Sequence, residues 1–63
     1  MSVGENIKRL RITRNITQQE LGEHIGSSQA MIAQVERGTK NISLPLAAEI
    51  AKFFGITLED LLA

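Results

Sequence analysis

The residues best suited to chemistry lie on one predicted helix in the middle of the chain. If Ile32 and Val35 face inward, a period of 3.6 residues turns the opposite side of that helix outward. The outward side chains are small, hydroxyl-bearing or amide-bearing, with one cation at the end: Ser28, Gln29, Ala30, Ala33, Gln34 and Arg37. Glutamine can bond adenine at N6 and N7, and an alanine methyl can touch a thymine methyl. The face is typical of a helix that reads DNA bases, although such residues also occur where an exposed helix is merely solvated.

Two predicted helices around one tight turn position this face. The first of the pair begins at Thr17, which can form a capping box with Glu20, and it ends at Gly26. The second begins at Ser27 or Ser28 and ends at Arg37, before a glycine. Gly22 allows the helices to approach closely, and Gly26 permits a turn conformation that a side chain would resist. The pattern indicates a helix-turn-helix, with an ordinary αα-hairpin of a small bundle as the alternative.

Three further helices complete the predicted fold. They cover residues 4–14, a segment capped by Ser43 that ends at Gly55, and a last segment from Thr57 to the C-terminus. The predicted core consists of Ile7, Leu10, Leu21, Ile25, Ile32, Val35, Leu46, Ile50, Phe53, Phe54, Leu58, Leu61 and Leu62. No alternation of apolar and polar residues is sustained, so strands are not expected. The sequence predicts an all-α fold of five helices in a single domain over residues 1–63.

The amino-acid composition excludes several classes of function. The chain has 63 residues, no cysteine, and seven basic against seven acidic side chains. Cysteine chemistry is excluded, and no apolar run approaches the ~20 residues of a membrane span, so a cytoplasmic location is expected. A net charge of zero argues against indiscriminate binding of polyanions. The charge is uneven, however, with +3 over residues 1–14.

Catalytic and metal sites find little support. His24 is the only histidine, and although Glu20 and Glu23 lie nearby, a metal site needs three or four ligands. No arrangement of nucleophile, base and orienting acid is evident. We therefore expect no enzyme activity, no cofactor, no metal and no membrane partner.

Several motifs along the chain point to one family. They lie in the first helix, in the two helices of the predicted motif, and in the last segment: Ile7-Lys8-Arg9-Leu10-Arg11, Thr17-Gln18-Gln19-Glu20-Leu21, Ile25-Gly26, Ile32-Ala33-Gln34-Val35-Glu36-Arg37-Gly38 and Phe54-Gly55-Ile56-Thr57-Leu58-Glu59-Asp60-Leu61-Leu62. With these motifs, residues 4–62 resemble the Cro/CI-type helix-turn-helix family, also called XRE-type or lambda-repressor-like.

The resemblance implies roles for individual residues. The third helix would lie in the major groove, with Gln29, Ala30 and Gln34 at positions that commonly touch bases, next to Ser28 and Ala33 on the same face. Five residues would hold the DNA backbone: Thr17, Gln18, Arg37, Lys40 and Asn41. Arg11 and Glu36 would form a partly buried structural ion pair rather than read bases.

The resemblance also implies a function. It indicates a sequence-specific regulator of transcription, of the repressor type, that binds double-stranded DNA as a homodimer on an inverted repeat. The alternative is a protein-interaction module on the same fold, in which Ala30, Met31 and exposed C-terminal leucines contact a partner. Arg37 and Lys40 beside the third helix weigh against that alternative, which needs no basic loop.

Overall fold

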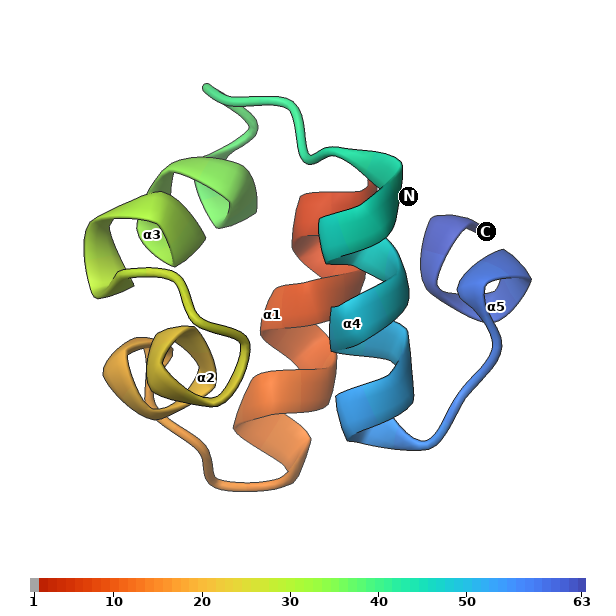
Figure 1. Cartoon of the computed structure of the whole chain (residues 1–63), viewed down its shortest axis with the longest axis horizontal. Coiled ribbons are helices and arrows are strands. Elements are labelled where there is room, and N and C mark those ends of the chain that lie inside the picture. Colours follow the sequence, from red (N-terminus) through yellow and green to blue (C-terminus); the bar gives the residue numbers. More distant parts are fainter. Residues whose placement is uncertain (1) are drawn as a thin grey trace.

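The computed structural model describes residues 2–63 as five α-helices joined by short turns (Figure 1). The helices are α1 (Val3–Thr13), α2 (Gln18–His24), α3 (Gln29–Arg37), α4 (Leu44–Phe54) and α5 (Leu58–Leu62). No strand occurs within residues 2–63, so the predicted all-α class is confirmed. In the same part of the chain, no helix is long and apolar enough to cross a membrane.

A hydroxyl side chain caps the start of every helix. The caps are Ser2, Thr17, Ser28, Ser43 and Thr57, and each hydroxyl accepts the backbone N–H of the third residue that follows. Such bonds satisfy N–H groups that have no partner within the helix. Because Ser2 caps α1, that helix begins at Val3, one residue earlier than the sequence predicts.

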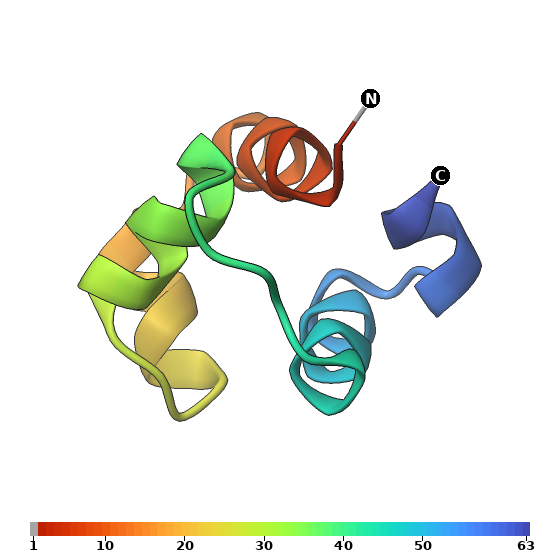
Figure 2. The same cartoon turned by 90° about the horizontal axis from the view of Figure 1, so that it is seen from above.

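The core lies where α1 and α4 meet the other helices. The α2–α3 pair lies on one side of α1 and α4, and α5 lies on the other (Figures 1 and 2). The buried apolar side chains are Ile7, Leu21, Ile32, Val35, Ala47, Ile50, Ala51, Phe54 and Leu61. The predicted core residues at its edge are only partly buried: Leu10, Ile25, Leu46, Phe53 and Leu58.

One predicted core residue is wrong. Leu62 is 44% exposed, whereas Leu61 is completely buried. Consecutive residues on a helix point about 100° apart, so the one-sided contact of the short α5 buries only one of the two leucines. Asn6, which the sequence did not single out, is buried instead, and its Nδ2 donates to the carbonyl oxygen of Leu61 at 2.8 Å. This bond ties α1 to α5.

Candidate nucleic-acid interface

The tight packing of α2 against the start of α3 depends on a missing side chain. A Cβ atom on Gly22 would lie 2.9 Å from the carbonyl carbon of Ser28. The carbonyl of Gly22 also accepts the backbone N–H of Ser27 at 2.7 Å, which closes the turn. Gly26 has a φ of 70°, within the left-handed region that favours glycine. Both glycines therefore have the local roles that the sequence predicts.

The outer face of α3 carries the predicted base-reading residues. Ser28, Gln29 and Ala30 are exposed, and Ala33 and Gln34 are partly buried. All five lie on α3 or at its cap, whereas Ile32 and Val35 are buried against the core on the inner side. The structure thus brings these residues together on one short helix whose outer surface is small and uncharged.

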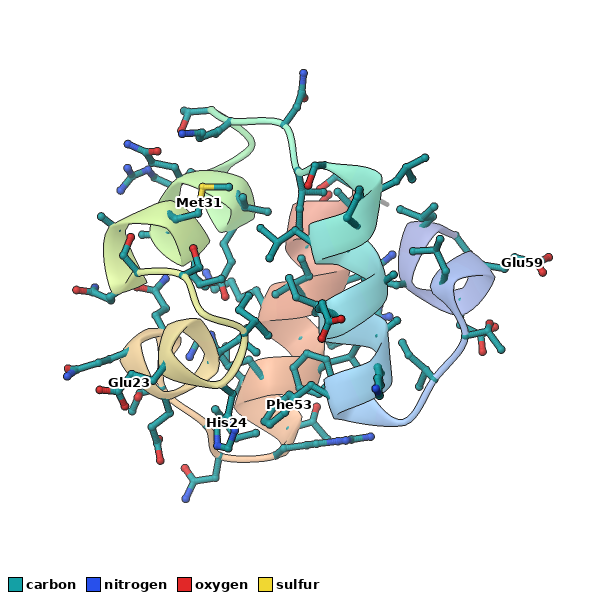
Figure 3. The ribbon with its side chains drawn as sticks, in the orientation of Figure 1. Glu23, His24, Met31, Phe53 and Glu59 are labelled. Atoms are coloured by element: carbon teal, nitrogen blue, oxygen red, sulfur yellow. The ribbon has the colours of Figure 1, made fainter. Side chains whose placement is uncertain are left out.

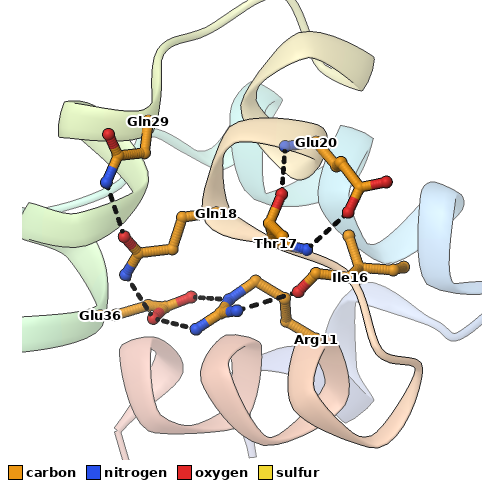
Figure 4. A network of polar contacts seen from close by, with 7 residues as sticks. All are labelled: Arg11, Ile16, Thr17, Gln18, Glu20, Gln29 and Glu36. Carbon is orange, nitrogen blue, oxygen red and sulfur yellow. Dashed lines mark hydrogen bonds and ion pairs between the residues drawn. The ribbon is translucent and has the colours of Figure 1, made fainter.

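An ion pair joins α1 to the last turn of α3 (Figure 4). Arg11 Nε donates to Glu36 Oε2 at 2.7 Å, and Arg11 Nη2 donates to Glu36 Oε1 at 3.1 Å. The side chains are 13% and 3% exposed, and Arg11 Nη1 also donates to the carbonyl of Ile16 at 2.9 Å. The hydrogen bonds to Glu36 raise the pKa of Arg11 above its usual value, against the opposing effect of burial. Two residues far apart in sequence are therefore held in the bidentate pair that the family resemblance implies.

Two glutamines extend this pair to the outer surface. Gln18 Nε2 donates to Glu36 Oε1 at 3.0 Å, and Gln18 Oε1 accepts Gln29 Nε2 at 3.1 Å (Figure 4). A residue expected at the DNA backbone and a residue expected at a base are therefore bonded to each other in the free protein. Sequence reasoning missed this link, since no spacing rule connects positions 18, 29 and 36.

The start of α2 is held by a capping box. Thr17 Oγ1 accepts the N–H of Glu20 at 3.0 Å, and the N–H of Thr17 donates to Glu20 Oε1 at 2.9 Å. The hydrogen bond from the backbone N–H of Thr17 lowers the pKa of the Glu20 carboxyl below its usual value, and the side-chain hydroxyl of Thr17 lowers it further. Thr17 and Gln18 line a surface hollow together with Arg11, Asn15 and Gln29. This hollow lies beside the N-terminal end of α3.

The remaining expected backbone contacts lie at the other end of α3. Arg37 ends the helix, and Arg37, Lys40 and Asn41 are all exposed. Thr39 ties the loop to the helix, because its N–H and its Oγ1 both donate to the carbonyl of Gln34, at 3.0 and 3.2 Å. The proposed contact residues therefore fall into two groups that flank the outer face of α3.

His24 contacts an aromatic ring. Its ring lies 4.7 Å from that of Phe53, between α2 and α4, while Glu23 points away from the molecule (Figure 3). Within residues 2–63, no group of three or more histidine, cysteine or acidic side chains could hold a metal ion.

These features define a class of protein. Two short helices meet at a glycine turn, and the second presents an uncharged outer face with cationic and polar groups beside it, which is the arrangement of a helix-turn-helix domain. The helix-turn-helix family model matches residues 7–61. The chain belongs to the XRE-type helix-turn-helix family, a family of DNA-binding transcription regulators rather than enzymes.

Two curated relatives match this chain over most of their own length. An uncharacterised HTH-type transcriptional regulator of Methanocaldococcus jannaschii is 42% identical over 55 residues, which are 87% of this chain and 83% of the relative. The control protein C.BamHI of Bacillus amyloliquefaciens is 32% identical over 60 residues, covering 94% of this chain and 74% of that protein.

A solved structure has the same fold. The P22 c2 repressor, crystallised with a synthetic operator, superimposes with a TM-score of 0.91 at 27% identity over 98% of this chain and 94% of the chain in that crystal structure. The expected lambda-repressor-like architecture is thereby confirmed.

Proposed function

We propose that this chain is a sequence-specific regulator of transcription, of the repressor type, that binds double-stranded DNA with α3 in the major groove. The observation that carries the proposal is the outer face of α3. The major groove is about 12 Å wide and admits a helix, and small side chains allow the closest approach. The P22 c2 repressor, which is similar over nearly the whole chain, was solved in complex with an operator.

We assign base contacts to the outer face and backbone contacts to its two flanks. Ser28, Gln29, Ala30, Ala33 and Gln34 read base edges. Thr17 and Gln18 approach the phosphates at one flank. This flank lies next to the base-reading face, since Gln18 is bonded directly to Gln29. Arg37, Lys40 and Asn41 hold the backbone at the other flank, where all three are exposed. Contacts to phosphate position the domain, and contacts to bases give the specificity.

We further propose that two copies bind an inverted repeat. A two-fold dimer places two recognition helices about one turn of DNA apart, in adjacent major grooves. Leu62 on α5 offers an apolar side chain for such a contact, since it is 44% exposed. The homodimer acts in the cytoplasm, on the nucleoid, and requires no cofactor.

The test is selection of duplexes from a randomised pool at low and near-physiological salt, followed by sequencing. An enriched inverted repeat that is retained at the higher salt supports a dimeric reader. An enriched single half-site would overturn the dimer, and no enrichment at all would overturn sequence-specific DNA binding in favour of a protein partner.

Two variants distinguish recognition of the bases from electrostatic attraction to the DNA backbone on the selected site. Gln29→Ala should relax the preference at one base position by about 1–3 kcal/mol, whereas Lys40→Ala should weaken all duplexes to a similar degree. An equal loss on every sequence from Gln29→Ala would reject the assigned role of Gln29.

A further inference from the structure

We propose that the outer face of α1 is a docking surface for an acidic segment of another protein, with an apolar side chain of that segment seated against Ile12. The surface consists of Glu5, Lys8, Arg9 and Ile12, here called the α1 stripe. These residues are three or four positions apart, so they share one side of the helix, and all four are exposed. Ile7 is buried on the opposite side. None of the four has a part in the proposed DNA contacts, so the docking surface does not depend on DNA recognition.

Ile12 supplies the apolar part of the surface. It is 59% exposed, whereas every other isoleucine within residues 2–63 is buried or partly buried. A single exposed apolar residue is common on protein surfaces and is no site by itself. Ile12, however, lines two hollows of the surface, one with the rest of the α1 stripe and Glu36, the other with Asn15 and Thr17. The side chains of a docked segment therefore have room beside Ile12.

Positive charge is concentrated on the same helix. Residues 1–14 contain four basic side chains and one acidic side chain, a net charge of +3, which leaves −3 on the rest of the chain. Arg11 is held in the nearly buried ion pair, and the guanidinium of Arg14 lies over an aromatic ring. Lys8 and Arg9 therefore provide the positive charge of the exposed face, directly beside Ile12 on the helix.

The two carboxylates near these cations are already engaged. Glu5 Oε1 accepts the backbone N–H of Ser2 at 3.1 Å, which holds this carboxylate at the N-terminal end of α1, away from Ile12. The Glu36 carboxylate accepts two hydrogen bonds from Arg11. The part of the α1 stripe next to Ile12 thus remains positive, and an acidic segment complements it.

A protein segment fits this surface better than DNA does. Contacts to phosphate come from cations, amides and hydroxyl groups, so Ile12 would gain nothing from a phosphate and Glu5 would repel it. Contacts between proteins combine an apolar centre with a polar rim. The docked segment therefore carries carboxylates opposite Lys8 and Arg9 and an apolar side chain over Ile12. Because the α1 stripe is about 10 Å long, two turns of helix span it, and the contact is of the small, transient kind.

The test is selection from a library of displayed random peptides of about 15 residues, enough for four helical turns, against the full chain without DNA. We expect enriched peptides that place carboxylates within one turn of an apolar residue. The variants are Ile12→Gln and Lys8→Glu. The matched controls are the same changes on α4, Leu44→Gln and Lys52→Glu, since Leu44 is 64% exposed and Lys52 is exposed. Circular dichroism verifies the fold of each variant.

Fluorescence anisotropy measures the affinity for an enriched peptide. Ile12→Gln should weaken binding about tenfold or more, because the buried contact of one isoleucine is lost. Lys8→Glu should weaken it to a similar degree and reduce its dependence on salt, because an attraction between charges becomes a repulsion. Both controls should stay within about twofold of the wild type, less than 0.5 kcal/mol. In NMR spectra, the peptide should shift the backbone amide signals of α1 and leave those of α4 in place.

Three results would overturn the docking surface. The first is a selection that enriches no peptide, and the second is enrichment of peptides without acidic residues. The third is a loss of peptide affinity in Leu44→Gln as large as that in Ile12→Gln, which would place the contact elsewhere. If no peptide is enriched and Lys8→Glu weakens every duplex more than Lys52→Glu does, the α1 stripe contacts the DNA backbone instead. If a peptide binds as expected but no DNA sequence is selected, the docking surface stands and the proposed function fails.

Discussion

Arg11 and Glu36 form a buried ion pair, and the domain depends on both members being present. Both side chains are nearly buried, and together they link α1, α2 and α3, since Arg11 also bonds the carbonyl of Ile16 and Glu36 also bonds Gln18. Removing one member leaves the other as a buried charge without its partner, which costs far more than the net contribution of an intact pair.

We therefore expect Arg11→Met to destabilise the domain by about 3–5 kcal/mol, enough to unfold much of it at 25 °C. The double change Arg11→Met with Glu36→Met should recover a substantial part of that loss, because no buried charge remains. Urea denaturation followed by circular dichroism measures both, with Lys8→Met on the exposed side of α1 as the control. A loss no larger than that of Lys8→Met would mean that solvent reaches the pair and screens it.

Glu20 gives a prediction about pH. Its bonds from Thr17 lower the pKa of the carboxyl in the folded protein below its value in the unfolded chain. The ionised carboxylate therefore favours the folded state above the unfolded pKa, and this contribution is lost as the pH falls through the folded pKa. Glu20→Gln should be less stable than the wild type at pH 7, and the difference should shrink as the pH falls through the folded pKa of Glu20.

Thermal denaturation at pH 7, 5, 4 and 3 measures this difference. Glu23→Gln is the control, since Glu23 is exposed on the same helix, and its effect should not follow the same course. A difference between the wild type and Glu20→Gln that stays constant down to pH 3 would contradict a role for the ionised carboxylate in the cap.

Among the elements, the helices were predictable because their ends are marked in the chain. Ser28, Ser43 and Thr57 cap their helices as expected, and Thr17 with Glu20 forms the expected capping box. The same spacing of serine and glutamate is present at Ser2 and Glu5, where it forms a second capping box and starts α1 at Val3. That signal was available in the sequence, and it would have corrected the predicted start of α1.

Contacts between elements were harder to predict than the elements themselves. Asn6 looks like an ordinary polar residue of a helix, and its partner, the carbonyl of Leu61, lies 55 positions away. The bond between Gln18 and Gln29 likewise depends on how α2 meets α3 and not on any local spacing. For Leu62, residue type was a poor guide, because the packing of α5 decides which leucine faces inward. In each case the missing information was the relative placement of two helices.

The close packing of α1 against α3 gives a prediction about stability. Gly4 is buried, and a Cβ atom on it would overlap the carbonyl oxygen of Val35 in α3. Gly4→Ala must therefore push the two helices apart, which should cost about 1–3 kcal/mol even though alanine favours helix. Chemical denaturation measures the cost, and Lys8→Ala in the exposed part of α1 should leave stability within about 0.5 kcal/mol of the wild type. A stabilised Gly4→Ala protein would show that α1 can shift without loss of packing.

For the whole molecule, the balance of charge sets how DNA is held. The chain carries seven basic and seven acidic side chains, so no general attraction to a polyanion is expected. Among the basic residues, Arg11 is paired with Glu36, and the guanidinium of Arg14 lies 5.2 Å from the centre of the Phe54 ring. Of the residues that we assign to the DNA backbone, only Arg37 and Lys40 are cations. Attraction to phosphate should therefore be local and weak, and the bases should decide where the protein binds.

This view predicts the salt dependence of binding. Two cations in each of two protomers give four neutralised phosphates, so log K should fall against log salt with a slope of about −3.6, or about 150-fold between 50 and 200 mM. Lys40→Ala should bring the slope to about −1.8, because each protomer then loses one contact, and Lys52→Ala on α4 should leave it unchanged. Fluorescence anisotropy on the selected inverted repeat measures the slopes. A wild-type slope near −7 would show that cations of α1 also reach the backbone, and a slope near −1.8 would mean that only one protomer engages the DNA.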